Sequence, residues 1–172
     1  SEDIQAVMQA LTFLDANEQL LPHKKILADG LLSFDKKEEL IPLLWKKLSE
    51  FHPRMQVNLL DYIRYASSNW KDEMLSMLET SQDREIQIAC VRYFGRYQDE
   101  RSVSFLLHHA EEEKEGFWEL QNACISALAM YPGPQTLEIL KKEISSKNWY
   151  VRHNAAKSLA VLNTDRDALA DI

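Results

Sequence analysis

Hydrophobic positions recur along the chain with the spacing of an amphipathic α-helix. Four segments of similar pattern align without gaps, and they cover residues 52–66, 83–97, 117–131 and 148–162. Apolar or small residues occupy positions 4, 8, 9, 12 and 15 of each segment, which fall on one face of a helix. The pattern therefore predicts four equivalent helices, each with one side packed in a core.

A further amphipathic helix is expected before each of these four. Asp35 opens a sequence that resembles a capping box, Asn69 and Asp99 are candidate caps, and Pro134 and Pro53 suit the first turn of a helix. Upstream, residues 2–14 and 22–34 form another expected pair. We therefore predict a single domain over 1–172, consisting of an N-terminal capping pair (1–35), four repeats (36–68, 69–99, 100–133, 134–165) and the start of a further helix (166–172).

Two stretches of this pattern resemble the HEAT repeat. Segment 39–44 (ELIPLL) followed by 52–57 (HPRMQV) is similar to its two helices, with a proline inside the first, and 148–159 (NWYVRHNAAKSL) is similar to its second-helix signature. The resemblance implies an all-α fold of about five helix pairs in a right-handed superhelix, an armadillo-type α-solenoid. It also implies that the second helices line a concave face.

Positions opposite the apolar columns predict which side chains that face would present. They mix both signs of charge and include several arginines, which suits a protein or peptide partner. The predicted binding ridge consists of Arg54, Asp61, Arg64, Glu85, Arg92, Arg96, Asn122, Ser126, His153 and Lys157. The alternative for any one of them is an ordinary solvated helix surface. We expect a non-catalytic interaction or scaffold module.

Charge and glycine content narrow the other function classes. The 172 residues contain 20 Lys+Arg and 27 Asp+Glu, a formal net charge of −7, and only four glycines. An acidic chain is a poor match for phosphate backbones or anionic lipid, so we expect no nucleic-acid partner. Arginines on the second helices still leave open a HEAT-like module that binds nucleic acid or acts as an enzyme, similar to the DNA glycosylases or lyases of this class.

Candidate catalytic and metal-binding residues are few. HEAT-like di-iron hydroxylases use paired His-Glu dipeptides, and none occurs here; the one metal-like cluster is His108-His109 with Glu111 and Glu112. Two ligands from such a cluster do not complete a site, so we expect no metal, no cofactor and no enzyme activity.

The cysteines are also expected to be structural. Cys90 and Cys124 hold equivalent positions on neighbouring helices, whose axes pack ~8–10 Å apart, whereas a disulfide needs Cα atoms within ~7 Å. We therefore expect reduced core thiols. Equivalent positions of Trp118 and Trp149 suggest structural wedges, and Arg152 is expected to bond to neighbouring turns.

Location and assembly follow from weaker signals. No run approaches the ~18 apolar residues of a membrane-spanning helix, and the acidic start is unlike a signal peptide. Because the chain ends within an expected helix, we interpret it as a piece of a longer protein. We expect a monomer in the cytoplasm, or the soluble part of a larger, membrane-anchored protein.

Overall fold

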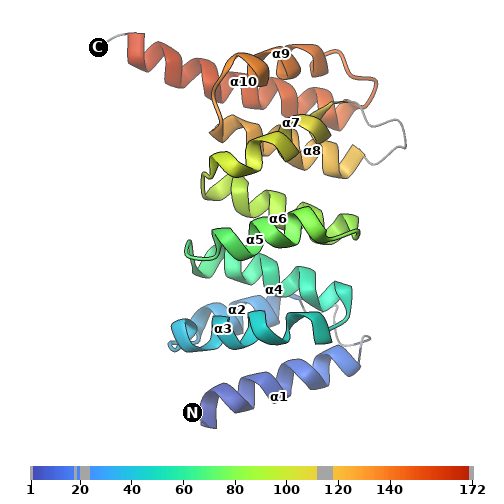
Figure 1. The fold of residues 1–172 in the computed structure, drawn as a ribbon, viewed down its shortest axis with the longest axis vertical. Coiled ribbons are helices and arrows are strands. Elements are labelled where there is room, and N and C mark those ends of the chain that lie inside the picture. Colours follow the sequence, from blue (N-terminus) through green and yellow to red (C-terminus); the bar gives the residue numbers. More distant parts are fainter. Residues whose placement is uncertain (1, 18, 20–23, 112–117, 171–172) are drawn as a thin grey trace. The chain divides into compact units, whose positions relative to one another are not determined.

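The computed structural model of the protein describes residues 2–17, 19, 24–111 and 118–170 (Figure 1). Every regular element in these ranges is a helix, which confirms the predicted all-α class. The chain divides into two compact units, Ser1–Trp70 and Lys71–Ile172, and a single repeat domain over 1–172 stays a prediction. No helix of the described ranges has both the length and the apolar character needed to cross a membrane.

The first unit is built from helix pairs around an aliphatic core. Its helices are α1 (Glu2–Ala16), α2 (Lys24–Ser33), α3 (Lys37–Lys47), the 3₁₀ turn η2 (Leu48–Glu50) and α4 (Pro53–Ala66). Helix α3 packs on α1 and α4, and α2 packs on α4. Fully buried side chains from three of these helices and η2 meet in the core: Leu11, Leu40, Leu44, Leu48, Met55, Leu59, Leu60 and Ile63.

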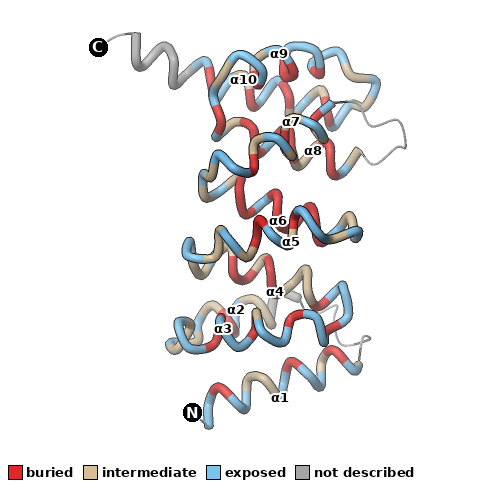
Figure 2. The backbone as a smooth tube through the Cα atoms, viewed as in Figure 1, coloured by how far each residue is buried: buried red, intermediate tan, exposed pale blue. Residues whose placement is uncertain are grey.

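The second unit places three helices over three others. Its elements are α5 (Lys71–Thr80), α6 (Arg84–Arg96), η3 (Glu100–Ser102), α7 (Val103–Ala110), α8 (Trp118–Ala127), η4 (Leu128–Met130), α9 (Pro134–Glu143) and α10 (Trp149–Ala170). Helices α5, α7 and α9 pack on α6, α8 and α10 respectively, and α8 packs between α6 and α10 (Figure 1). Buried residues lie on the sides of the helices that face one another (Figure 2).

Several predicted helix starts are confirmed. Pro53 and Pro134 lie in the first turns of α4 and α9, and Pro42 lies inside α3. The carboxylate of Asp99 accepts a hydrogen bond from the backbone N of Arg101 at 3.0 Å, so it caps η3 as expected. The backbone N–H groups in the first turn of a helix have no acceptor within the helix. Asp99 accepts a hydrogen bond from one such group, and proline has no N–H group to leave without a partner.

Three other details differ from the sequence predictions. Helix α3 begins at Lys37 and its N-cap is Lys36, without a side-chain cap, so Asp35 forms no capping box. Helix α5 begins at Lys71, one residue later than expected. Helix α10 runs unbroken from Trp149 to Ala170, so it continues where we expect a new helix over 166–172.

The buried face of α10 also differs from that of its counterparts. Ile125 of α8 stands at position 9 of its repeat segment and is fully buried. Its carbonyl oxygen accepts a hydrogen bond from Ser158 Oγ of α10 at 3.0 Å. The equivalent residue of α10, Ala156, is exposed. Within the part of the chain that the structure describes, no helix follows α10 and packs against Ala156. An apolar residue at position 9 is therefore buried only where another helix packs against it.

Replacing glycine by alanine should change the stability of the protein in opposite directions at two positions, Gly30 and Gly95. A Cβ on Gly95 of α6 would lie 3.3 Å from the Cβ of Ala127, whereas one on Gly30 of α2 would meet no atom within 4 Å. Replacing glycine by alanine inside a helix gains about 1 kcal/mol, but close contact at Gly95 would force α6 and α8 apart. We expect Gly30→Ala to stabilise the protein by about 0.5–1 kcal/mol and Gly95→Ala to destabilise it by about 1 kcal/mol. Urea unfolding of both variants tests this, and an equal gain at both positions would contradict the tight α6–α8 contact.

Candidate functional site

In the first unit, the predicted ridge residues differ in their exposure to solvent. Arg54 is exposed on the first turn of α4, but Asp61 and Arg64 are half-buried, with Asp61 Oδ1 3.6 Å from Arg64 Nη2. Arg64 Nη2 also donates to Tyr65 Oη at 3.1 Å, and its guanidinium lies 4.7 Å from the centre of that ring. Arg64 is therefore held by contacts within its own helix.

In the second unit, two of the predicted residues form side-chain hydrogen bonds. Asn122 is half-buried, and its Oδ1 accepts a hydrogen bond from Asn154 Nδ2 at 2.6 Å, which joins α8 to α10. Arg96 is exposed, and its Nε donates to Tyr97 Oη at 3.1 Å. The contact of Asn122 indicates a structural role, whereas that of Arg96 is local to the chain and leaves the side chain exposed.

The remaining ridge residues of this unit form an exposed row across three packed helices. Arg92 of α6, Ser126 of α8 and Lys157 of α10 hold the same repeat position, and all three are exposed. Glu85 is exposed near the start of α6, and His153 is exposed one turn before Lys157. We call Glu85, Arg92, Ser126 and Lys157 the second-helix row. None of its three charged members makes an ion pair with any residue that the structure describes.

An aromatic cluster covers the beginning of α8 and α10. Trp118 stacks on Tyr150 with ring centres 5.2 Å apart, and Trp149 stacks on His153 at 5.4 Å. Trp149 is 59% exposed, so much of its ring lies on the surface of the cluster. Asn148 and Lys147 precede this helix, and the Arg152 guanidinium donates to the carbonyl oxygens of Ser146 at 2.8 Å and Lys147 at 3.1 Å, which confirms its structural role.

The candidate nucleophiles and metal ligands are placed unfavourably for chemistry. Cys90 and Cys124 are fully buried and neither is in a disulfide, as predicted, and burial raises the pKa of the Cys90 thiol to about 12. A thiol with this pKa stays protonated at neutral pH and is a poor nucleophile. The ring of His109 lies against that of Phe105, with ring centres 4.2 Å apart and the ring planes tilted by 36°. Within the described ranges, no three His, Cys, Asp or Glu side chains could hold a metal ion; Glu112 of the metal-like cluster lies outside them.

Sequence reasoning missed two hollows on the layer formed by α5, α7 and α9. One, of about 350 Å³, lies between α7 and α9, and the other, of about 440 Å³, lies between α5 and α7. Both are partly lined by His108 of α7. The signal was present in the polar residues Gln135, Glu138 and Lys142, whose spacing of three and four places them along one side of α9.

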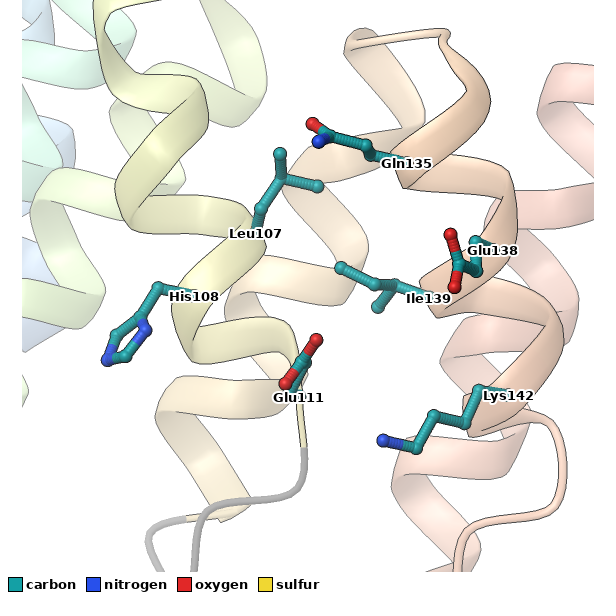
Figure 3. A pocket seen from close by; sticks show the side chains of 7 residues that line it. All are labelled: Leu107, His108, Glu111, Gln135, Glu138, Ile139 and Lys142. Atoms are coloured by element: carbon teal, nitrogen blue, oxygen red, sulfur yellow. The ribbon is translucent and has the colours of Figure 1, made fainter.

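Figure 3 shows the side chains around the hollow between α7 and α9. Leu107 of α7 and Ile139 of α9 supply its apolar surface. Glu111 and Lys142 extend toward the same end of the hollow from opposite helices, while Gln135 lies at the other end (Figure 3). The site can therefore offer an apolar contact with polar groups around it.

Comparison with known proteins adds no relative. No protein-family model, curated protein or solved structure matches the chain.

Proposed function

We propose that this protein is a non-catalytic interaction or scaffold module, whose HEAT-like helix pairs form a solenoid and bind a protein or peptide partner through the second helices. The observation that carries the proposal is the second-helix row. Arg92 and Lys157 are exposed on α6 and α10, the two helices that pack on either side of α8, and neither forms an ion pair with the described residues. Ser126 is exposed at the equivalent position of α8.

Side-chain chemistry of the row favours a partner with exposed carboxylates. Arginine and lysine carry long, flexible stems and several hydrogen-bond donors, so both can reach a carboxylate on an apposed surface. Glu85 adds one negative group near the start of α6, so a partner with a basic residue at the matching end gains a second contact. Complementary charges of this kind accelerate association and select between partners more than they raise affinity.

Two further observations fit the same proposal. The buried thiols of Cys90 and Cys124, which form no disulfide, are consistent with a reducing compartment such as the cytoplasm. The pairwise packing of α5–α6, α7–α8 and α9–α10 repeats one structural unit, and arrays of such units commonly bind partners along one extended surface. We propose that the protein acts there as a monomer.

Charge reversal in the second-helix row tests the proposal. Arg92→Glu together with Lys157→Glu should reduce the recovery of a specific partner from a lysate by at least about fivefold, because two attractive contacts become repulsive. Quantitative mass spectrometry of captured proteins measures the loss, and circular dichroism should remain that of the wild type.

The matched control changes two exposed lysines of the first unit. Lys46→Glu with Lys47→Glu alters the net charge by the same amount, and both lysines are exposed at the end of α3. Partner recovery should survive this change. If both double variants capture the same proteins as the wild type, the second-helix row is not the binding surface.

A further inference from the structure

A second, separate binding site is indicated by the hollow between α7 and α9. Its volume of about 350 Å³ lies near the lower end of the ~300–1,000 Å³ typical of ligand sites. Space of this size accommodates one or two side chains of a peptide and excludes a folded domain. The apolar surface comes from Leu107 and Ile139, on facing helices (Figure 3).

Charges around the hollow are unbalanced. Glu111 and Glu138 bring two carboxylates and Lys142 brings one ammonium group, so these three groups sum to −1. Across the described parts of the chain, none of the three takes part in an ion pair. A bound cationic group would therefore gain a partner without displacing an existing one.

We infer that this hollow binds a short, extended peptide segment in which an aliphatic residue is flanked by basic residues. The aliphatic side chain would contact Leu107 and Ile139, where it removes apolar surface from water. A neighbouring lysine or arginine would pair with Glu111 or Glu138. The amide of Gln135 offers both a donor and an acceptor to the peptide backbone at the other end of the hollow.

The same charges disfavour other occupants. Two carboxylates repel the phosphates of nucleic acid and the carboxylates of an acidic peptide. A purely apolar ligand would bury carboxylate surface without pairing it, which costs free energy. The site is also independent of the second-helix row, because it is formed by α7 and α9 and shares no residue with that row.

Titration with a synthetic peptide tests the inference directly. The probe is acetyl-Gly-Lys-Leu-Lys-Gly-amide, added to the isotope-labelled full chain while backbone amide signals are recorded by NMR. We expect saturable shifts confined to residues 107–111 and 135–142, with a Kd of about 1 mM. Replacing leucine by serine in the peptide should weaken binding at least about threefold, and replacing both lysines by glutamate should abolish it.

Two variants with the same change in charge separate this site from general attraction to an acidic protein. Glu138→Lys should weaken binding of the probe at least about fivefold, whereas Glu85→Lys, at an exposed carboxylate of the second-helix row, should leave the Kd unchanged. No shifts up to about 10 mM, equal binding of the glutamate peptide, or an equal loss in Glu85→Lys would overturn the inference. Each of these results would leave the proposal for the second-helix row standing.

Discussion

Replacing Ile125 by aspartate is expected to unfold the Lys71–Ile172 unit. Ile125 is fully buried in α8, next to the equally buried Cys124, and α8 packs against α6, α7 and α10. A carboxylate at this position would lose its hydration without gaining a partner, since the neighbouring columns are apolar. The cost should be at least about 4 kcal/mol, a large part of the 5–15 kcal/mol that stabilises an ordinary domain.

The adjacent residue provides the matched control for this prediction. Ser126 is exposed on the same helix, so Ser126→Asp introduces the same group one position away and should change stability by less than about 0.5 kcal/mol. Circular dichroism at 222 nm and urea unfolding measure both effects. An Ile125→Asp variant with wild-type helicity and an unchanged urea midpoint would show that this face of α8 tolerates a charge.

The helices could be predicted from sequence because their signals are local. Apolar residues repeat with helical spacing, and residues such as Asp99 and Pro134 mark helix starts through their own side chains. The residues at position 4 of the four repeat segments are all buried, as the alignment predicts: Met55, Ile86, Leu120 and Val151. Local pattern therefore determined the class of fold and most of the element order.

Burial on the outer helix depended on what packs against it. Ala156 has the same place in the pattern as Ile125, yet it is exposed because no described helix covers it. Trp149 similarly shares its place with Trp118 but is 59% exposed. A repeat alignment shows which positions are equivalent, but it does not show against which of the helices a further helix packs.

The candidate sites were predictable only in part, for a related reason. Three members of the second-helix row, Arg92, Ser126 and Lys157, could be listed from the alignment because they hold one repeat position, and all three are exposed. Sequence reasoning could not foresee that Asn122 bonds to Asn154, since their spacing of 32 residues carries no local signal. The hollow between α7 and α9 was missed because it depends on how two helices from different pairs approach each other.

Replacing Tyr131 by phenylalanine is expected to destabilise the same unit by about 2–4 kcal/mol. The buried hydroxyl of Tyr131 donates to the carbonyl oxygen of Phe94 at 2.7 Å and accepts from the backbone N of Asp99 at 3.1 Å. Ser102 Oγ lies 3.2 Å from the same oxygen. One side chain thus connects the end of α6 with the start of η3 and the end of η4, and its removal leaves buried polar groups of the backbone without a partner.

The pH dependence of this contribution follows from the titration of the hydroxyl. Burial raises the pKa of Tyr131 above its ordinary value of about 10, so the folded state holds the proton more tightly than the unfolded chain. The stability that depends on the neutral hydroxyl should be fully present below about pH 10 and should decline as the pH rises toward the raised pKa. Tyr131→Phe should therefore differ most from the wild type at pH 7–9, and the difference should shrink at higher pH.

An exposed tyrosine in the same unit separates the hydrogen bonds from the loss of a hydroxyl as such. Tyr150 is 55% exposed on α10 and stacks on Trp118 through its ring, which phenylalanine preserves. Tyr150→Phe should therefore change the free energy of unfolding, measured by urea titration, by less than about 0.5 kcal/mol. If Tyr131→Phe unfolds at the same urea concentration as Tyr150→Phe, then the Tyr131 hydroxyl does not hold α6, η3 and η4 together, and packing of its ring accounts for its burial.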